Sequence, residues 1–482
     1  MESFDLLIIG GGINGAAIAR DAAGRGQKVL LVEKEDLAAH TSSASSKLIH
    51  GGLRYLGYYE FRLVRQALRE REILLRTAPH IVRPLPFLLP HASEMRPWWM
   101  VRAALSLYDL LSFRGSLPRS RRVRERALSA PLKEQARQRL ALYWDAWVDD
   151  ARLVVLNALD AAERGAEIAT RTEFISARRE GDLWRAALSN GREVAASVIV
   201  NAAGPWVGEV LGRRLNEKSR SGMRLIKGSH IVVPRLAGGD HAYILQQPDG
   251  RVVFALPYGA FTLVGTTDIP VSEPDGAVIE PHEIDYLCAA ANLYFERQTS
   301  PFDVIWSYSG VRALYDDGAA DAQAVTRDYH LELDVGGGPK LLSVFGGKIT
   351  TARALAEEAL DCLGIKGRKV TSSSSLPGGD ILPAFNHWLD ALTAWLPAET
   401  VFRLSRSYGT RLRELLGAAN DLKSLGRHFG GGLYEAEVRY LVAREFAQTA
   451  DDIMWRRTKL GLKMTAAEQQ GLARWMKDYG PS

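Results

Sequence analysis

The sequence has few cysteines and no long hydrophobic run. Its 482 residues include two cysteines, Cys288 and Cys362, which lie far apart and outside any CxxC pattern. This spacing supports neither a disulfide framework nor a cysteine-based metal site, so we expect a reducing compartment and no metal. No apolar run approaches the roughly 20 residues that span a bilayer, and the first predicted strand leaves no room for a signal peptide. We expect a protein that is neither exported nor membrane-spanning.

A strong excess of one charge is also missing, except in one segment. Lysine and arginine total 61 against 56 acids, but residues 96–126 hold eight arginines and two acids. Before the basic stretch, Trp98, Val101, Leu105 and Tyr108 follow helical spacing, which predicts an amphipathic helix. Two interpretations stay open: a core-facing helix with a solvated loop, or a surface for anionic membranes. Nucleic acid is disfavoured because aromatic and basic residues are not interleaved elsewhere.

A nucleotide-binding pattern opens the chain. A short apolar run over 6–9 enters the glycine turn Gly10-Gly11-Gly12-Ile13-Asn14-Gly15, and a second run over 29–32 ends at Glu33. Gly10 allows a sharp turn, Gly12 lets backbone N–H groups approach a pyrophosphate, and Gly15 lets the helix lie close to its strand. Glu33 would accept hydrogen bonds from a ribose and would repel a 2′-phosphate, which disfavours NADP. The pattern predicts a dinucleotide site.

The remaining sequence predicts an α/β protein whose nucleotide domain is built from separate segments. Short strands are expected near 168–176, 184–189, 198–203 and 341–345, an exposed helix over 60–78, and a largely antiparallel sheet between about 223 and 309. The predicted domains are a Rossmann-like nucleotide-binding domain (1–75, 146–222 and 311–370), an amphipathic and basic insertion (76–145), an antiparallel-sheet substrate domain (223–310), a linker (371–380) and a helical C-terminal domain (381–482).

Several blocks then carry a family resemblance over nearly the whole chain. They include IIGGGINGAAIARDAAGRG, TSSASSKLIHGGLRYL, WVDDARLV, NAAGPWV, RLIKGSHIVVPR, YSGVRAL, SVFGGKITT and DDIMWRRTK. Together they resemble the aerobic, FAD-dependent glycerol-3-phosphate dehydrogenases, within the glycine/D-amino-acid-oxidase-like flavoprotein superfamily. Small departures, such as Ala313 where the family often has proline and Ile349 where it often has leucine, remove no polar group.

The resemblance implies FAD as the cofactor. The serine-rich loop with Lys47 offers hydroxyls, backbone donors and one cation to the phosphates and ring. Gly346 and Gly347, at a helix start, would let backbone amides face the pyrimidine end of the isoalloxazine, although glycines there can also be purely structural. The expected cofactor-binding residues are Gly10, Gly12, Asn14, Gly15, Glu33, Thr41, Ser42, Ser45, Ser46, Lys47, Gly204, Gly346, Gly347 and Thr350.

The implied substrate is sn-glycerol 3-phosphate, oxidised at its secondary alcohol to dihydroxyacetone phosphate. A phosphate dianion favours guanidinium groups, and Arg54, beside Tyr55, and Arg327 are the candidates for it. Hydride transfer to the flavin also requires removal of the alcohol proton. His50, His230 and Lys348 are the candidate bases, and the residues alone do not choose among them. Arg312 and Lys348 would stabilise the forming alkoxide and the anionic reduced flavin.

Electrons must then leave the flavin. The resemblance implies transfer to membrane ubiquinone by a cytoplasmic protein bound peripherally to the inner face of the cytoplasmic membrane, in agreement with the basic amphipathic segment. The principal rival is a glycerol-3-phosphate oxidase that produces peroxide from oxygen. Less favoured rivals are a flavin-containing nucleic-acid modifier and a relative that acts on an amino acid. The sequence leaves open the quinone site, covalent attachment of FAD, and whether the chain forms a homo-oligomer.

Overall fold

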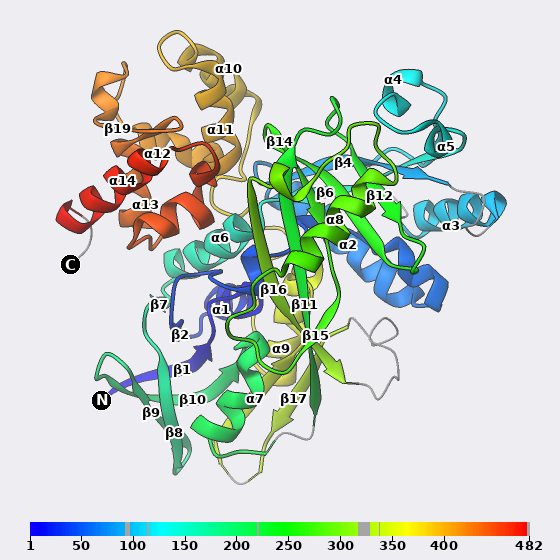
Figure 1. Ribbon diagram of the computed structural model, residues 1–482. Coiled ribbons are helices and arrows are strands. Elements are labelled where there is room, and N and C mark those ends of the chain that lie inside the picture. The colour runs from blue at the N-terminus through cyan, green and yellow to red at the C-terminus, as the bar shows by residue number, and fades with distance from the viewer. Residues whose placement is uncertain (92–96, 113–114, 219–220, 317–327, 337, 480–482) are drawn as a thin grey trace.

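The parallel strands near the N-terminus form the first of two large sheets in the computed structural model (Figure 1). The structure describes residues 1–91, 97–112, 115–218, 221–316, 328–336 and 338–479. Within them the sheet runs in the order β17-β18-β10-β1-β2-β7, and the β8–β9 hairpin extends from β10. Its strands are β1 (Glu2–Ile9), β2 (Val29–Val32), β7 (Glu167–Ala169), β8 (Phe174–Glu180), β9 (Leu183–Leu188), β10 (Glu193–Asn201), β17 (His330–Asp334) and β18 (Lys340–Phe345).

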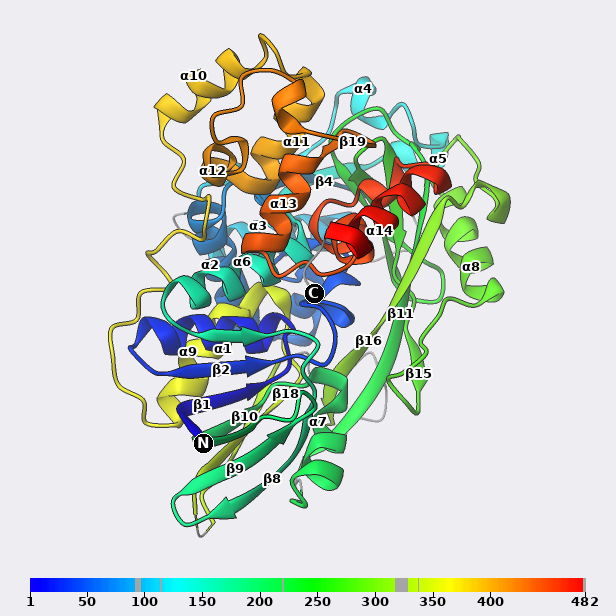
Figure 2. The same cartoon turned by 90° about the vertical axis from the view of Figure 1, so that its left-hand side faces the viewer.

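Strand β1 is central and buried on both faces, as its continuous apolar run predicts. Leu6 and Ile8 pack beneath three helices, α1 (Ile13–Gly24), α6 (Asp150–Glu163) and α9 (Ala352–Cys362). Leu7 and Ile9 face the opposite cluster, which includes Trp184 from the β8–β9 hairpin. Figure 2 shows α1 and α9 on one side of the sheet and the hairpin projecting from it. This doubly covered parallel sheet confirms the predicted α/β class.

The second sheet is largely antiparallel and larger than expected. Its strands are β3 (Leu48–Ile49), β4 (Val82–Pro90), β5 (Arg121–Arg122), β6 (Leu140–Val148), β11 (Gly222–Pro234), β12 (Ala242–Gln246), β13 (Val252–Tyr258), β14 (Phe261–Gly265), β15 (Ile269–Val271) and β16 (Trp306–Asp316). It therefore extends beyond residues 223–310. Sequence reasoning missed β4 because Pro84 and Pro86 interrupt its apolar run, and proline argues against a central strand.

Two helices between β3 and β6 differ from expectation in their exposure. Helix α2 (Phe61–Thr77) was expected to be exposed, but one face is buried, including the charged Glu70 and Arg71. Helix α3 (Trp98–Leu111) buries Leu105 and Tyr108 against the second sheet, so the core-facing interpretation holds for that side. Its other side leaves Trp99 exposed. The short helices α4 (Arg126–Ser129) and α5 (Glu134–Arg137) follow, and α8 (Pro281–Asn292) packs on the same sheet.

The C-terminal domain is helical, as predicted. It contains α10 (Pro383–Leu392), α11 (Ala398–Tyr408), α12 (Leu412–Leu416), α13 (Glu435–Arg444), a π-helical turn (Asp452–Arg457), α14 (Ala466–Tyr479) and the small hairpin β19 (His428–Gly430) and β20 (Leu433–Tyr434). Buried ion pairs dock it onto the nucleotide domain: Arg152 with Glu445, and Arg457 with Asp36 at 2.8 Å. The segment before it, expected as a linker, is packed as well, since Leu376 is fully buried.

Candidate active site

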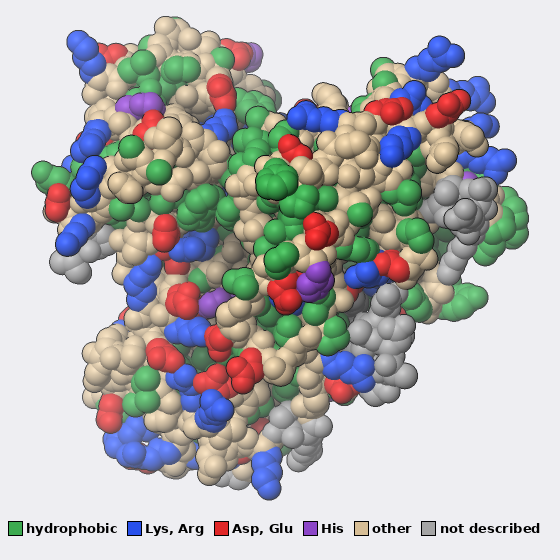
Figure 3. All heavy atoms as spheres, viewed as in Figure 1, with side chains coloured by type: hydrophobic (Ala, Val, Ile, Leu, Met, Phe, Trp, Pro, Cys, Tyr) green, Lys and Arg blue, Asp and Glu red, His purple; other side chains and the backbone are tan. Residues whose placement is uncertain are grey.

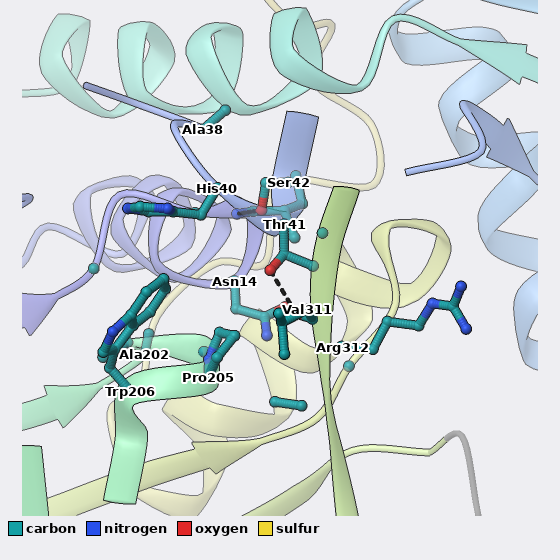
Figure 4. Close-up of a pocket in the computed structure, with 18 of the residues that line it drawn as sticks. Asn14, Ala38, His40, Thr41, Ser42, Ala202, Pro205, Trp206, Val311 and Arg312 are labelled. Carbon is teal, nitrogen blue, oxygen red and sulfur yellow. Dashed lines mark hydrogen bonds between the residues drawn. The ribbon is translucent and has the colours of Figure 1, made fainter. Parts of the chain in front are cut away.

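One cavity of about 540 Å³ lies at the carboxyl ends of β1, β2 and β10, where doubly wound sheets bind ligands. Its walls come from the glycine turn, the serine loop after β2, the end of β10, strand β16 and residues 346–350. Figure 4 shows residues from these segments converging on it: Asn14, Thr41, Pro205, Trp206 and Val311. Segments far apart in the sequence therefore form a single site.

The glycine turn has the geometry that its sequence predicts. Gly10 has φ +110°, and a Cβ there would lie 2.6 Å from the carbonyl oxygen of Ala202. A Cβ on Gly15 would lie 1.9 Å from the oxygen of Gly10, so only glycine lets α1 lie this close to β1. Gly10 and Gly12 line the cavity, whereas Gly15 lies behind it. The N-terminus of α1 therefore faces the cavity, as expected for a pyrophosphate site.

Glu33, at the end of β2, lines the cavity and also supports the turn. Its carboxylate accepts hydrogen bonds from the backbone N–H groups of Gly11 at 2.6 Å and Glu35 at 2.9 Å. Burial raises the pKa of Glu33, and these two hydrogen bonds oppose the shift. The side chain predicted to bind a ribose thus also fixes the backbone of the glycine turn.

Asn14 connects the glycine turn with the segment after β18. Its Nδ2 donates to the oxygen of Gly346 at 3.0 Å, while its buried Oδ1 has no hydrogen-bond partner among the described residues. Gly346 and Gly347 have φ +75° and +104° and line the cavity with Thr350 and Gly204. A buried acceptor without a partner next to left-handed glycines is typical of a site that receives a polar ligand.

The serine loop divides its hydroxyls among three structural elements. Thr41 Oγ1 donates to the oxygen of Val311 at 2.6 Å, a bond drawn in Figure 4. Ser42 Oγ accepts from the N–H of Ile13 at 3.0 Å, and Ser46 Oγ lies 2.9 Å from Nε2 of His230. The loop thus joins α1, β16 and β11, and Thr41, Ser42, Ser45 and Ser46 all line the cavity.

Lys47 departs from the sequence prediction. Its ammonium was expected to face the cofactor phosphates, but the residue is 1% exposed and is absent from the cavity wall. The Nζ atom lies 2.9 Å from both carboxylate oxygens of Asp150 and donates to the oxygen of Ser43 at 3.0 Å. Asp150 also accepts from Ser45 Oγ at 2.8 Å. Lys47 is therefore a structural cation that holds the serine loop on α6, because a buried charge requires a partner.

His50 and Lys348 lie together at the other end of the cavity. Burial, followed by the charges of Lys348 and Arg54, lowers the pKa of His50 to about 4, so its imidazole is neutral at pH 7. Lys348 Nζ lies 4.0 Å from the centre of the Tyr55 ring, and the Arg54 guanidinium lies 5.9 Å from the same ring. His50, Tyr55 and Lys348 line the cavity, whereas Arg54 stands behind Tyr55. This end of the cavity is therefore cationic and aromatic.

His230, on β11, and Arg312, on β16, complete that end. Burial lowers the pKa of His230 well below its usual value, and the charges of Arg312 and Lys47 lower it further. The Arg312 guanidinium pairs with Asp268, donates to Thr266 Oγ1 at 2.7 Å and to the oxygen of Thr267 at 3.1 Å. In Figure 4, Val311 and Arg312 point to opposite sides of β16, as successive strand residues do.

One predicted site residue, Arg327, lies outside the described part of the chain. Conversely, the structure places residues at the site that sequence reasoning missed. His40 and Trp206 were missed: both line the cavity, and their ring centres lie 4.5 Å apart with the planes tilted by 55°. Figure 4 shows the two side chains. Trp206 stands inside the block NAAGPWV and could have been found there, whereas His40 has no local signal. Asp150, the partner of Lys47, lies in the block WVDDARLV.

This fold and this cavity define a flavoprotein oxidoreductase of the doubly wound type. The family model for FAD dependent oxidoreductases matches residues 5–353, and the model for the C-terminal domain of alpha-glycerophosphate oxidase matches residues 369–478. The chain belongs to the FAD dependent oxidoreductase family, and FAD is its cofactor. The unpaired oxygen of Asn14, the glycine turn and the cavity volume all fit that cofactor.

Proteins of other organisms are similar to this chain over nearly its full length. Glycerol-3-phosphate dehydrogenase of Pseudomonas aeruginosa is 50% identical over 494 residues, covering 100% of this chain and 96% of that protein. D-erythritol 1-phosphate dehydrogenase of Brucella abortus is 50% identical over 491 residues, covering 98% of each. The solved structure of the glycerol-3-phosphate dehydrogenase from Bacillus halodurans complexed with FAD has a TM-score of 0.75 and 27% identity, covering 99% of this chain and 90% of that one.

Proposed function

We propose that this protein oxidises sn-glycerol 3-phosphate to dihydroxyacetone phosphate and passes the electrons to ubiquinone. The observation that carries the proposal is the meeting of two neutral imidazoles, His50 and His230, with the cations Lys348 and Arg312 at one end of the FAD cavity. The names of two similar proteins, the glycerol-3-phosphate dehydrogenases of Pseudomonas aeruginosa and Bacillus halodurans, support the same substrate. When bound, FAD supplies the hydride acceptor.

The cationic end of the cavity suits a phosphorylated alcohol. Lys348 lines the cavity, and Arg54 lies close enough to His50 to lower its pKa. A phosphate dianion between these groups would offset their charges, and Tyr55 provides a hydroxyl and a ring beside them. We assign phosphate binding to Arg54, Tyr55 and Arg327. Arg312, beside His230, would face the carbon-bound oxygen.

A neutral imidazole is the form that can accept the alcohol proton. His50 and His230 are both neutral at pH 7 because their pKa values are lowered. Binding a dianion nearby raises the pKa of an imidazole, which strengthens it as a base when substrate is present. Lys348 is the third candidate base, and as an ammonium it would instead stabilise the alkoxide with Arg312.

Anaerobic titration of the purified flavoprotein with glycerol 3-phosphate tests this proposal. We expect the flavin absorbance to bleach with one equivalent of substrate and dihydroxyacetone phosphate to appear in equal amount. A flavin that stays oxidised with excess substrate would contradict the proposal. Arg54→Ala should weaken substrate binding far more than FAD retention, because we assign Arg54 to the phosphate of the substrate and not to the cofactor.

A longer polyol phosphate is the second candidate substrate. The relative from Brucella abortus is named for D-erythritol 1-phosphate and is as similar as the first relative, at 50% identity. Both substrates share a phosphate monoester and a secondary alcohol, so the same cations serve either. Comparing kcat/KM for the two compounds decides between them. We expect glycerol 3-phosphate to be preferred, and a preference for the four-carbon compound would reverse the assignment.

An oxidase reaction is the second candidate for the fate of the electrons. The family model that matches residues 369–478 is described by alpha-glycerophosphate oxidase. Turnover with a soluble quinone under argon, with little peroxide formed in air, is the result we expect. Stoichiometric peroxide and no need for quinone would favour the oxidase.

We further propose peripheral attachment to the inner face of the cytoplasmic membrane. Among the described residues, no helix is both long enough and apolar enough to cross a bilayer. Exposed aromatic and apolar side chains cluster in sequence at 58–61 and on α3; they are Tyr58, Tyr59, Phe61, Trp99, Met100 and Leu110. Exposed arginines follow at 119, 121, 122, 124 and 126, and Figure 3 shows basic side chains gathered at the end of the molecule where α4 and α5 lie. Such a combination binds anionic lipid surfaces.

Co-sedimentation with vesicles tests the attachment. We expect binding to vesicles with anionic lipid at low salt and loss of binding when Trp99 and Leu110 are replaced by serine. Replacing the exposed Phe302 and Val278, which lie on another segment, is the matched control. Equal binding of all variants would refute this surface.

A further inference from the structure

The block DDIMWRRTK has no role in the proposed reaction, although it connects the C-terminal domain with the other two. It forms the π-helical turn Asp452–Arg457 and ends at the half-buried Lys459. Arg457 pairs with Asp36 at 2.8 Å, which fixes the turn against the loop after β2. π-Helical turns are rare, and those that occur often lie at functional sites. The turn projects one large side chain, Trp455, toward the second sheet.

Trp455 begins a row of ring contacts, which we call the stack. Its ring lies 5.1 Å from that of Trp306 with the planes at 16°. The Trp306 ring lies 5.0 Å from that of Tyr308, with the planes tilted by 45°. Tyr308 in turn stacks on the imidazole of His230 at 4.8 Å and 17°. Three aromatic rings thus lead from the C-terminal domain to an imidazole of the active site. Trp306 and Tyr308 are on β16 and share one face of it because they are two residues apart.

The packing fixes both ends of this stack. At the outer end, a Cβ on Gly461 would lie 2.6 Å from the Trp455 ring, so the chain passes directly beside it. At the inner end, a Cβ on Gly265 of β14 would lie 2.1 Å from the His230 ring, so the backbone of β14 passes directly beside the imidazole. Tyr308 also donates to the oxygen of Ser45 at 2.8 Å, next to Ser46, whose Oγ contacts His230. On the side away from the cavity, the imidazole is therefore held between Gly265, Ser46 and Tyr308.

We propose that Trp455 and Trp306 are positioning residues for His230, so that docking of the C-terminal domain completes the active site. The inference rests on the proposed function. Neither tryptophan lines the cavity, so neither touches cofactor or substrate. They act through Tyr308, which carries their position to the imidazole. Displacement of a reacting group by about 1 Å can reduce the rate about a hundredfold.

The charged groups around His230 influence its pKa. Arg312 on β16 and Lys47 in the serine loop face it, and each is paired, with Asp268 and Asp150 respectively. We expect removal of the Trp455 ring to let Trp306 and Tyr308 shift and to admit water toward the imidazole. The pKa of His230 would then rise, because burial is the largest cause of its lowering.

Kinetics of Trp455→Ala and Trp455→Phe holoenzymes test the inference. We expect Trp455→Ala to lower kcat by about tenfold to a hundredfold with FAD retained, and to move the acid limb of the kcat/KM profile to higher pH. Trp455→Phe keeps an aromatic ring, so its kcat and its pH profile should both stay close to those of the unmodified protein. The control is Trp475→Phe: Trp475 belongs to the core of the same domain and contacts Phe429 edge to face, outside the row of rings that leads to His230.

The outcomes separate this inference from the proposed function. Turnover of glycerol 3-phosphate by the unmodified protein tests the function itself. If that turnover is present and Trp455→Ala keeps the same kcat and pH profile, the positioning role is wrong. It is equally wrong if Trp455→Ala and Trp475→Phe lose activity only in proportion to their loss of thermal stability or FAD. If the unmodified protein does not turn over, the function fails first.

Discussion

The hydroxyl of Tyr108 on α3 accepts a hydrogen bond from the backbone N–H of Gly51 at 2.8 Å. It also donates to the carboxylate of Asp145 at 2.8 Å, and Asp145 is paired with Arg71. Gly51 directly follows His50, so a helix with an exposed apolar side holds the loop that carries a candidate base. The contact is close, since a Cβ on Gly51 would lie only 2.7 Å from the Tyr108 hydroxyl oxygen. A side chain at position 51 would therefore disturb it.

Tyr108→Phe should therefore lower activity and stability together. It leaves the buried N–H of Gly51 without its acceptor and removes a donor from Asp145, which costs about 1–3 kcal/mol. Because the loop of His50 loses its anchor, we expect kcat/KM to fall as well, while FAD remains bound. Thermal unfolding and steady-state kinetics measure the two effects. Tyr479→Phe, at an exposed position, is the control, and equal behaviour of the two variants would contradict this role.

Local patterns predicted the nucleotide domain, because each of its signals lies within a few residues. The positive φ of Gly10 and the close approach of Gly15 follow directly from the glycine turn. The pairing of Lys47 with Asp150 did not follow, because the partners are 103 residues apart and no local pattern records which charge faces which. Strand β4 was hidden by its prolines, and the aromatic stack joins residues 230, 308 and 455, which only the tertiary fold brings together.

Asp150→Asn and Lys47→Met should both destabilise the protein, the first more strongly. Asp150→Asn leaves the Lys47 ammonium buried without its counter-charge, which costs about 3–5 kcal/mol. Urea unfolding of the apoprotein measures this cost without any contribution from FAD. If Lys47 instead bound the cofactor phosphates, Lys47→Met would weaken FAD binding and leave apoprotein stability unchanged. The exposed pair Lys28 and Glu2 provides a control in which Lys28→Met has little effect.

The two active-site histidines should make stability fall in mild acid. The pKa of His50 is lowered to about 4 in the folded protein, against about 6.5 in the unfolded chain. Between these values the unfolded chain binds a proton that folded His50 does not, so unfolding is favoured as pH falls from 6.5 toward 4. The slope is at most about 1.4 kcal/mol per pH unit for each such group. His230 contributes in the same direction.

Urea unfolding of the His50→Gln holoenzyme between pH 7.5 and 4.5 measures this contribution, a range chosen around the usual histidine pKa of about 6.5. We expect the free energy of unfolding to depend less steeply on pH than in the unmodified protein, since glutamine takes up no proton. His282→Gln, at an exposed position, is the control substitution. Identical slopes for all three proteins would show that His50 does not contribute.

Gly228→Ala should displace Arg312 without unfolding the protein. A Cβ on Gly228 would lie 2.0 Å from Nη2 of Arg312 and 2.6 Å from Thr266 Oγ1, and the end of an arginine side chain can move aside. Moving it breaks the bond to Thr266 and shifts the positive charge that we assign to the alkoxide, so we expect kcat to fall by about a hundredfold. Thermal stability should change little compared with Gly208→Ala, where a Cβ meets nothing within 4 Å. Unchanged kcat in Gly228→Ala would mean that the Arg312 guanidinium does not stabilise the reacting oxygen.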